Sequence, residues 1–507
     1  MTDIIILHPK DDVGVALRPL KAGAHAAVTI NGKEHAIELA EDVPKGHKVA
    51  LRVIEKDRSV MKFGYSIGKA SQLILPGAWV HTHNLKTGLA GEVEYQYTPG
   101  SATAPSFAAA GNPADGERTF QGYLRRNGEA GIRNEIWIIN TVGCINKTCE
   151  QLARLADQQF RGRGIDGVYH FPHPYGCSQL GDDLAHTQRL LASLARHGNA
   201  AGVLIVGLGC ENNQIDQMKA LIGEDEPERV RYLRAQDVED ELASGLAMIE
   251  ELVRYAEGYQ RSELPLSLLK IGLKCGGSDG LSGITANPLA GRIADWVTAA
   301  GGTALLTEVP EMFGAETILM ERAENEQVFQ EITSLINDFK QYFISHGQQI
   351  YENPSPGNKD GGITTLEEKS LGCTQKGGTA IVSAVLPYGE RSSRPGLNLI
   401  QAPGNDLVSV TALAAAGAHL VLFTTGRGTP FGGPVPTVKI STNSELAARK
   451  PHWIDFNAGT LVEGARMEEL EEALADQILQ LASGVRQTHN EIGGFREISI
   501  FKDGVIL

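Results

Sequence analysis

The chain has 507 residues, of which 42% are hydrophobic and 21% are charged, a balance typical of a soluble globular protein. This length exceeds what one core can organise, so we expect two or three domains. The formal net charge of −15 argues against a nucleic-acid partner. No segment approaches the roughly 18 consecutive apolar residues that a membrane span needs. The first residues lack a basic region and a cleavage site, so we expect a cytoplasmic protein with no membrane partner.

Residues 1–98 contain short apolar runs separated by turns and show no long helical period, which predicts a small β domain. Two polar groups stand out in it, Gly46-His47-Lys48 and His81-Thr82-His83. In a strand, His81 and His83 would point to the same face and could chelate a divalent metal. The alternative is that they hydrogen-bond to water and backbone.

Residues 99–118 are rich in Pro, Ala, Gly and Ser, which is the composition of a linker. From residue 119 onward, expected strands and helices alternate. This alternation predicts parallel sheets with right-handed crossovers, whose ligands bind outside the carboxyl ends of the strands. We therefore expect one α/β domain at 119–262 and a C-terminal α/β domain at 263–507.

Five of the six cysteines lie beside glycine at expected strand ends or in an expected loop. They are Cys144, Cys177, Cys210, Cys275 and Cys373. A cytosolic-looking chain of this size is not expected to build a disulfide framework. If the five turns meet at one crevice, the thiols could hold a soft metal or an iron–sulfur cluster. Otherwise each is a small buried hydrophobic side chain, which is our interpretation of Cys149 inside an expected helix.

The segment 274–288 joins an apolar strand to a helix with Asn287 as its expected N-cap and Pro288 as its first residue. A glycine-rich turn at a helix N-terminus presents backbone N–H groups that suit a carboxylate or phosphate. The alternative is a tight turn with one buried cysteine. A second glycine-rich segment, 353–378, is expected as a long functional loop.

No nucleophile elbow or phosphate-binding loop is evident in the sequence. Gly207-Leu208-Gly209 begins like the dinucleotide motif but lacks its third glycine, so a nicotinamide cofactor is poorly supported. Metal-assisted chemistry on an acidic, hydroxylated small molecule is what remains.

These motifs resemble the altronate and galactarate dehydratase family of sugar-acid hydro-lyases, and the resemblance covers essentially the whole chain. Its motifs lie at 46–48, 80–84, 131–135, 175–183, 207–213, 274–288, 353–359 and 424–430. Three further segments, at 309–314, 369–376 and 451–456, look like the altronate branch rather than the galactarate branch. The resemblance implies a SAF-type β-clip domain at 1–98.

The resemblance also implies conversion of D-altronate to 2-dehydro-3-deoxy-D-gluconate with ferrous iron, Mn²⁺ being a candidate substitute. Galactarate, another sugar acid or a sulfolactate-type substrate stays open as an alternative, as does a non-catalytic sugar-acid sensor. Fusion of the β-clip domain to the rest argues against the sulfolactate branch. Iron would be mononuclear on His47, His81 and His83, or part of a cluster on Cys144, Cys177, Cys210, Cys275 and Cys373.

The expected partner of the chain is a small-molecule sugar acid, and a homodimer is one candidate assembly. The candidate general bases are His47, Lys48 and His173. Backbone N–H groups near Ser278 and Thr285 would bind the substrate carboxylate, with Arg133 or Arg427 as the countercharge. Arg427 could instead form a surface ion pair. The full substrate-binding set is Arg133, Asn134, Ser278, Asp279, Thr285, Asn287 and Arg427.

Overall fold

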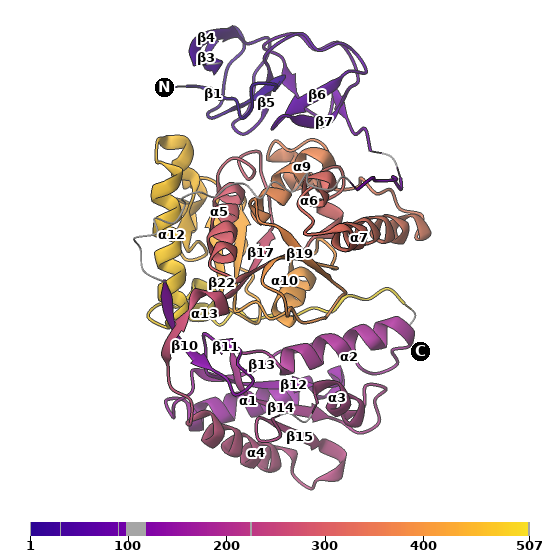
Figure 1. Ribbon diagram of the computed structural model, residues 1–507, viewed down its shortest axis with the longest axis vertical. Helices are drawn as coiled ribbons and strands as arrows, with labels where there is room; N and C mark the ends of the chain where they lie inside the picture. Colours follow the sequence, from indigo (N-terminus) through magenta and orange to yellow (C-terminus); the bar gives the residue numbers. More distant parts are fainter. Residues whose placement is uncertain (1, 31, 90, 98–117, 224–225, 505–507) are drawn as a thin grey trace.

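The computed structural model describes residues 2–30, 32–89, 91–97, 118–223 and 226–504. Three parts are stacked along the long axis (Figure 1). The N-terminal β domain lies at one end, the C-terminal α/β region in the centre and the middle α/β region at the other end. The predicted β domain followed by parallel α/β regions is thus confirmed. The expected linker falls, except for Arg118, outside the described residues.

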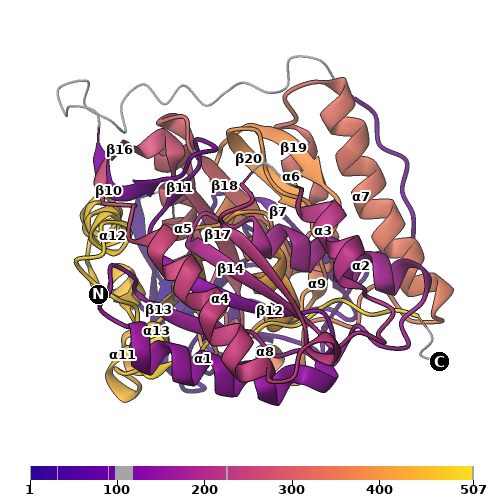
Figure 2. The same ribbon diagram turned by 90° about the horizontal axis from the view of Figure 1, so that it is seen from below.

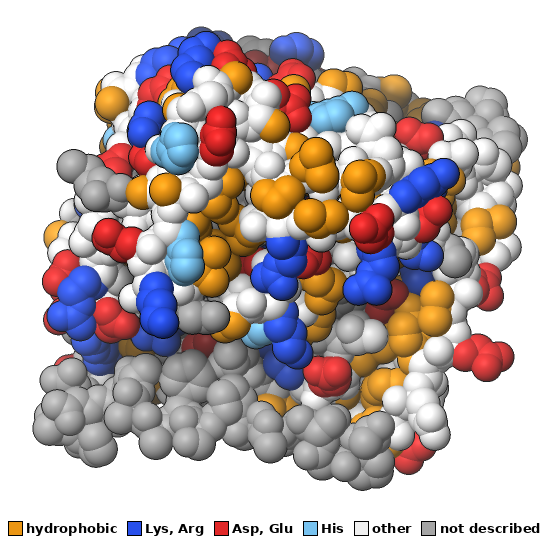
Figure 3. All heavy atoms as spheres, turned by 90° about the horizontal axis from the view of Figure 1, so that it is seen from above, with side chains coloured by type: hydrophobic (Ala, Val, Ile, Leu, Met, Phe, Trp, Pro, Cys, Tyr) orange, Lys and Arg blue, Asp and Glu red, His pale blue; other side chains and the backbone are white. Residues whose placement is uncertain are grey.

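The N-terminal domain is built from short strands in two sheets, ordered β4-β3-β1-β2-β5-β8 and β6-β7-β9. The strands are β1 (Ile4–Ile5), β2 (Val13–Ala16), β3 (His25–Ile30), β4 (Lys33–Glu38), β5 (Lys48–Ala50), β6 (Ser59–Lys62), β7 (Tyr65–Ala70), β8 (Trp79–Val80) and β9 (Leu85–Lys86). From above, hydrophobic side chains gather between groups of Lys and Arg (Figure 3). Among the described residues of this domain, the large exposed hydrophobic side chains are Val53, Tyr65, Leu73 and Leu75.

The prediction that His81 and His83 share a strand is wrong. Asn84 closes a turn after β8, because its Oδ1 accepts from the backbone N–H of His81 at 2.9 Å and its Nδ2 donates to the carbonyl of Trp79 at 2.9 Å. His81 is consequently buried and His83 is exposed. The two imidazoles therefore do not line one face of a strand.

The middle region holds a parallel sheet ordered β13-β12-β14-β15 and a small antiparallel sheet ordered β11-β10-β16. Its strands β12 and β14 are buried on both faces, as their continuous apolar runs predict. Helices α1 and α4 lie side by side across one face (Figure 2). The elements are β10 (Thr119–Leu124), β11 (Ala130–Gly131), β12 (Glu135–Asn140), α1 (Asn146–Phe160), β13 (Gly167–His170), α2 (Gly181–Ala195), β14 (Ala200–Gly207), α3 (Ile215–Ile222), β15 (Val230–Arg234), α4 (Glu241–Ala256) and β16 (Ser262–Pro265).

The C-terminal region is a seven-stranded parallel sheet ordered β19-β20-β18-β17-β21-β22-β23. The chain leaves β17 toward β18 on one side and returns to β21 on the other, which creates the crevice where such sheets bind ligands. The strands are β17 (Lys270–Cys275), β18 (Thr303–Leu306), β19 (Val382–Leu386), β20 (Gly396–Ile400), β21 (Leu420–Thr425), β22 (Thr437–Ser441) and β23 (Phe456–Asn457).

Helices cover both faces of this sheet. They are α5 (Ala286–Ala299), α6 (Glu316–Met320), α7 (Glu326–Ser345), α8 (Pro356–Asp360), α9 (Leu366–Thr374), α10 (Asp406–Ala415), α11 (Ser444–Arg449), α12 (Met467–Ala482) and α13 (His489–Gly493), with a short 3-10 helix η4 at Val309–Glu311. No helix in the described part of the chain is long and apolar enough to cross a membrane.

Two local predictions in this region are wrong. The segment 353–378 is not a plain loop, because Thr365 caps α9 by accepting from the backbone N–H of Glu368. Helix α5 begins at Ala286, and Asn287 is not its N-cap. The Asn287 side chain instead donates to the carbonyl of Gly372 at 3.0 Å and accepts from the hydroxyl of Thr424 at 2.6 Å.

Candidate functional site

The N-terminal domain is fastened to the C-terminal region by a buried carboxylate. Glu368 in α9 pairs with Lys48 and Lys62 of the β domain, each with its Nζ 2.8 Å from a different Glu368 oxygen. Burial alone would raise its pKa, but the charges of Lys48 and Lys62 lower the pKa of Glu368 to about 2. Lys48 also donates to the carbonyl of Gly362 at 2.8 Å and to the hydroxyl of Thr364 at 2.7 Å. All three of its donor positions are therefore used.

Two imidazoles lie beside this ion pair, with their ring centroids 5.0 Å apart. Trp79 Nε1–H donates to Nδ1 of His47 at 3.1 Å, so Nε2 of His47 carries the proton and faces the carbonyl of Asp360 at 3.2 Å. Nδ1 of His81 lies 2.9 Å from the hydroxyl of Thr364. Burial lowers the pKa of both imidazoles, that of His81 to about 4, so both are neutral at neutral pH.

Three loops meet backbone to backbone next to His47. The N–H of Gly280 donates to the carbonyl of Gly361 at 2.7 Å. A Cβ at position 280 would lie 1.9 Å from the carbonyl oxygen of Gly46, and one at position 362 would lie 2.4 Å from it. Only glycine allows this approach, so these glycines set how closely the β domain sits on the crevice.

A surface cleft of about 320 Å³ opens at the same junction. It is lined by Lys45, Gly46, Asp279, Leu281, Gly361, Gly426, Arg427, Asn443, Glu445 and Arg449. Arg427 follows β21 at the crevice, as expected from the sequence. Together with Lys45 and Arg449 it gives the cleft three cations against two carboxylates, which suits an anionic ligand.

The glycine-rich turn after β17 is braced by its own polar side chains. Asp279 accepts from the hydroxyls of Ser282 and Thr442 at 3.1 and 2.9 Å and from Nδ2 of Asn443 at 3.2 Å. The hydroxyl of Thr285 donates within this bracing, 2.8 Å from the carbonyl of Thr442. Among the described residues, the buried hydroxyl of Ser278 has no hydrogen-bond partner, which leaves it as the free polar group of the turn.

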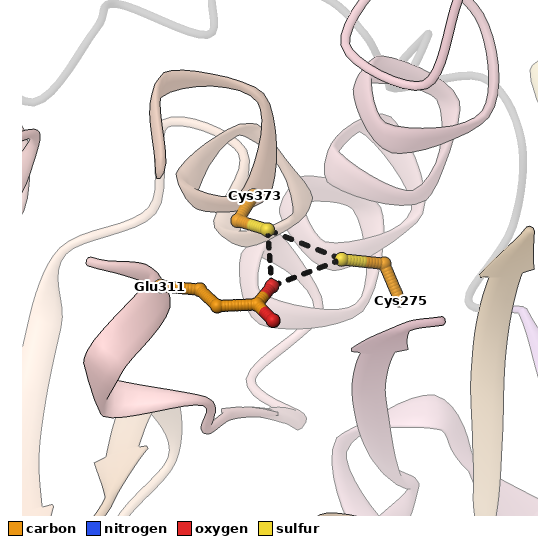
Figure 4. A group of neighbouring side chains, drawn as sticks. All are labelled: Cys275, Glu311 and Cys373. Atoms are coloured by element: carbon orange, nitrogen blue, oxygen red, sulfur yellow. Dashed lines mark hydrogen bonds between the residues drawn. The ribbon is translucent and has the colours of Figure 1, made fainter. Parts of the chain in front are cut away.

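A second polar group is buried deeper, below α9 (Figure 4). Cys275 ends β17, Cys373 lies in α9 and Glu311 ends η4. Their atoms are close: the two sulfurs are 3.1 Å apart, and Oε2 of Glu311 lies 2.9 Å from Cys373 and 3.7 Å from Cys275. These three donors form a group that could hold a metal ion.

Lysines surround these thiols. Lys376 Nζ lies 2.9 Å from the sulfur of Cys275 and 2.8 Å from Glu308, while Lys369 pairs with Glu311 at 3.0 Å. The hydrogen bond from Cys373, together with the charge of Lys376, lowers the pKa of Cys275 to about 5 despite its burial. Cys275 is therefore a thiolate, and its partner stays protonated.

The structure does not bring the five cysteines to one crevice. Cys144, Cys177 and Cys210 are exposed in the middle region, at the opposite end of the molecule from the β domain. Cys373 differs from its predicted setting because it lies within α9. Cys149 is buried in α1, as expected, and burial raises its pKa to about 12.

Three other predicted site residues also lie in the middle region and have structural partners. Arg133 is 3% exposed and pairs with Glu491 at 2.8 Å, so it is not available as a substrate countercharge. Asn134 is fully buried and accepts from Arg125 at 2.8 Å. His173 has both ring nitrogens engaged, because Nδ1 accepts from the N–H of Tyr175 and Nε2 donates to the carbonyl of Asn140.

Local sequence patterns do not identify the buried carboxylates and lysines that compensate one another's charge in the C-terminal region and at its contact with the β domain. They are Lys62, Glu308, Glu311, Glu368, Lys369 and Lys376. One signal was available: Lys274 interrupts an apolar strand, and a lysine there is buried only with a partner. That partner is Glu308, 2.5 Å away.

Comparison with known proteins accounts for all three parts of the chain. Residues 2–88 match the altronate/galactarate dehydratase SAF domain, residues 122–257 the second domain of D-galactarate dehydratase/altronate hydrolase, and residues 266–506 the D-galactarate/altronate dehydratase C-terminal domain. The first match confirms the expected SAF-type domain.

Full-length relatives agree with these matches. The chain is 51% identical to altronate dehydratase of Escherichia coli, over 99% of each chain, and 52% identical to altronate dehydratase of Bacillus subtilis, over 100% of each. It is 32% identical to galactarate dehydratase (L-threo-forming) of Escherichia coli, over 98% of this chain and 96% of that one. The chain therefore belongs to the altronate and galactarate dehydratase family.

Proposed function

We propose that this chain dehydrates D-altronate to 2-dehydro-3-deoxy-D-gluconate. The proposal rests on the sequence identity of this chain to relatives from different branches of the family. Relatives named altronate dehydratase are 51% and 52% identical, against 32% for galactarate dehydratase and 31%, over 75% of the chain, for a (2R)-sulfolactate sulfo-lyase subunit. Galactarate and sulfolactate are therefore the weaker alternatives.

The cleft at the junction supports a small acidic substrate. Its volume of about 320 Å³ is in the usual range of small-molecule sites. Arg427 is the best placed countercharge, since its guanidinium can bind a carboxylate with two parallel hydrogen bonds. Lys45 and Arg449 add positive charge to the same cleft.

The reaction removes a proton from C2 and hydroxide from C3, which together leave as water, and the resulting enol tautomerises to the 2-keto acid. The base must be neutral and must have a lone pair free to take the C2 proton. Both His47 and His81 are neutral, but both ring nitrogens of His47 are already hydrogen-bonded, so His81 is the better candidate. Lys48 is less suitable because its three donor positions are engaged. We assign Lys48 to positioning: it fixes Thr364, which in turn orients the ring of His81.

Cys275, Cys373 and Glu311 are the residues that would hold iron(II), with Mn²⁺ as a candidate substitute. Two sulfurs and one carboxylate oxygen form a donor set that iron accepts, and all three atoms lie within 4.8 Å of one another. The histidine set fits less well, because both ring nitrogens of His47 are hydrogen-bonded and His83 is exposed. When bound, the metal would supply positive charge to stabilise a developing enolate. A cytoplasmic location and a homodimer stay predictions.

The test is anaerobic incubation of the full chain with D-altronate and ferrous iron, followed by detection of a 2-keto-3-deoxy acid. In Arg427→Lys we expect KM to rise about tenfold, since a lost charged hydrogen bond is worth roughly 1.5–3 kcal/mol. Arg126→Lys, at an exposed ion pair with Glu228, is the matched control. Faster turnover of galactarate would contradict the substrate assignment. Binding of altronate without product would favour a sensor.

A further inference from the structure

One carboxylate of the junction cleft has no partner for its charge. The cleft of about 320 Å³ is lined by two acidic side chains, those of Asp279 and Glu445. Asp279 uses its oxygens to brace the glycine-rich turn, where it accepts from two hydroxyls and one amide. Glu445 is exposed, and within the described residues its side chain forms no hydrogen bond or ion pair. It is therefore the carboxylate of the cleft that remains free for a ligand.

The cations of the cleft are unpaired as well. Lys45, Arg427 and Arg449 are exposed, and no ion pair among the described residues involves them. Glu445 and Arg449 lie four positions apart on α11, a spacing at which opposite charges often pair on a helix surface. They do not pair here, so Glu445 is not accounted for as the partner of a neighbour on its own helix.

Hydrogen bonds tie the segment that carries Glu445 to the segment that carries Arg427. Asn443 is the N-cap of α11, and its Oδ1 accepts from a backbone N–H of the first turn at 2.8 Å. Its Nδ2 donates to the carbonyl of Gly426 at 3.0 Å and to Asp279 at 3.2 Å. Glu445 follows Asn443 by two positions, and Arg427 follows Gly426 directly. A free carboxylate and a free guanidinium are thus carried by two segments that are fastened to each other beside one cleft.

The charges of the cleft match an anion with one negative charge. Three cations against two carboxylates leave one excess positive charge. A sugar acid with a single carboxylate balances this charge. A sugar acid with a carboxylate at each end would leave an excess negative charge, and its second carboxylate would lie in the same cleft as Glu445. Bringing like charges together is an effective way for a site to reject the wrong ligand.

We propose that Glu445 is a specificity-determining residue that rejects sugar acids with a second carboxylate. The proposal rests on the dehydratase function proposed above and concerns the end of the substrate that does not react. Arg427 binds the carboxylate at C1, and Glu445 accepts a hydrogen bond from a hydroxyl toward C6. A terminal CH₂OH group can donate this hydrogen bond, whereas a terminal carboxylate cannot donate and is repelled. Glu445 thereby distinguishes aldonic acids from aldaric acids.

This role differs from a catalytic role and from a purely surface role. The discrimination arises from charge at the far end of the substrate, so substitution of Glu445 should change which acid binds. The proton transfer at C2 and the departure of the C3 hydroxyl belong to other residues. A glutamate that only keeps the surface hydrated would have no influence on the choice between an aldonic and an aldaric acid.

Altronate and altrarate are the matched pair of ligands, because altrarate is altronate with C6 oxidised to a carboxylate. Isothermal titration calorimetry of the full chain, without added iron to avoid turnover, measures both dissociation constants. We expect the wild type to bind altronate at least about tenfold more tightly than altrarate, since like charges in one site repel. In Glu445→Gln, which keeps the shape and removes the charge, this preference should fall to about twofold or less.

Two further variants are the controls. Glu445→Asp keeps the charge and should keep most of the preference for altronate. Glu469→Gln changes an exposed glutamate of α12 whose side chain forms no hydrogen bond or ion pair within the described residues, and it should bind both acids like the wild type. Added salt should narrow the preference of the wild type, because mobile ions screen exposed charges, and it should change that of Glu445→Gln much less.

Equal affinity of the wild type for the two acids would overturn the proposal, as would an unchanged preference in Glu445→Gln or loss of both acids in that variant. Failure of the wild type to bind either acid would overturn it together with the placement of the substrate in this cleft. A preference for altronate that disappears in Glu445→Gln, without any 2-keto-3-deoxy acid from the iron-loaded chain, would support the specificity role and count against the dehydratase assignment alone.

Discussion

The molecule has two sheet edges with cysteines at the same architectural position and in opposite environments. In the C-terminal region, Cys275 and Cys373 are fully enclosed among lysines and glutamates that compensate one another's charge. In the middle region, Cys144, Cys177 and Cys210 face solvent. The carboxyl ends of parallel strands gather functional groups in both cases, so the position alone does not decide the chemistry. What lies over the edge decides it.

Helix α9 and the β domain cover the C-terminal edge, and the covering explains its charges. Removing ions from water is costly, so each buried charge there has a partner within 3.2 Å: Lys274 with Glu308, Lys369 with Glu311 and Lys48 with Glu368. The middle edge has no such cover among the described residues and needs no such pairing. The two edges thus differ in how deeply their charged groups are buried and in whether those charges are paired.

The largest expected effect follows from breaking the compensation at the buried edge. Glu368→Gln leaves Lys48 and Lys62 enclosed without their carboxylate, whose oxygens lie 2.8 Å from each of the two Nζ atoms. We expect a loss of about 3–5 kcal/mol in the free energy of unfolding, since an uncompensated buried charge costs that much. Urea denaturation followed by tryptophan fluorescence measures it.

The matched control is Glu150→Gln, which breaks an exposed pair with Lys147. Exposed pairs contribute roughly 0–1 kcal/mol, so this variant should unfold like the wild type. Equal effects of the two substitutions would show that burial does not set the strength of the pairs, and the contrast between the two edges would then fail.

The strands of both edges could be predicted from the sequence, whereas the cover could not. The apolar runs within β12, β14, β17 and β21 predict buried strands, because buried parallel strands consist of continuous apolar residues. Helix α9 was hidden by the glycines around it, although Thr365 followed by Glu367 and Glu368 is a helix start.

Long-range pairing explains the remaining errors. Arg133 was predicted to face substrate, but its partner Glu491 lies 358 positions away in the sequence. The pairing of Lys48 and Lys62 with Glu368 likewise joins residues more than 300 positions apart. Local patterns carry no information on such contacts. They identify which residues have side chains suited to binding or catalysis. Only the fold shows which of these side chains are already paired with another residue.

A second prediction concerns the backbone that holds the middle edge together. Gly176→Ala would place a Cβ 1.9 Å from the carbonyl oxygen of Thr141 at a φ of 101°. We expect a loss of about 2–4 kcal/mol, from the left-handed backbone and the steric clash together. Gly128→Ala is the control, because its φ is 84° but nothing lies within 4 Å of its Cβ. If thermal unfolding shows the same loss in both, the close approach of the turns contributes nothing.

A third prediction uses acid to distinguish the interior of the middle region from its edge. Burial lowers the pKa of His173 from 6.5 to about 4. Between these values the unfolded chain binds a proton that the folded chain refuses, so stability falls as the pH drops from 6.5 to 4. His173→Gln keeps a donor and an acceptor but does not titrate, and it should lose about 1–3 kcal/mol less than the wild type over this range.

The measurement is the urea midpoint at pH 7, 6 and 5. His170, whose pKa burial also lowers to about 4, remains in the variant, so the pH dependence should be reduced and not abolished. An unchanged pH dependence in His173→Gln would mean that this imidazole is protonated in the folded chain, contrary to its hydrogen bonds with Tyr175 and Asn140.

The smallest effect is expected at the exposed edge itself. In a chain stripped of metal, Cys144, Cys177 and Cys210 should react with a thiol reagent under native conditions, while Cys149, Cys275 and Cys373 should react only after unfolding. Because the three exposed sulfurs are not packed, modifying them should change the unfolding free energy by no more than about 0.5 kcal/mol. Mass spectrometry of the labelled peptides gives the sites, and a thermal scan gives the stability. Fast labelling of Cys275 would instead mean that α9 opens readily, and the buried edge would then be accessible in the way that we assign to the middle edge alone.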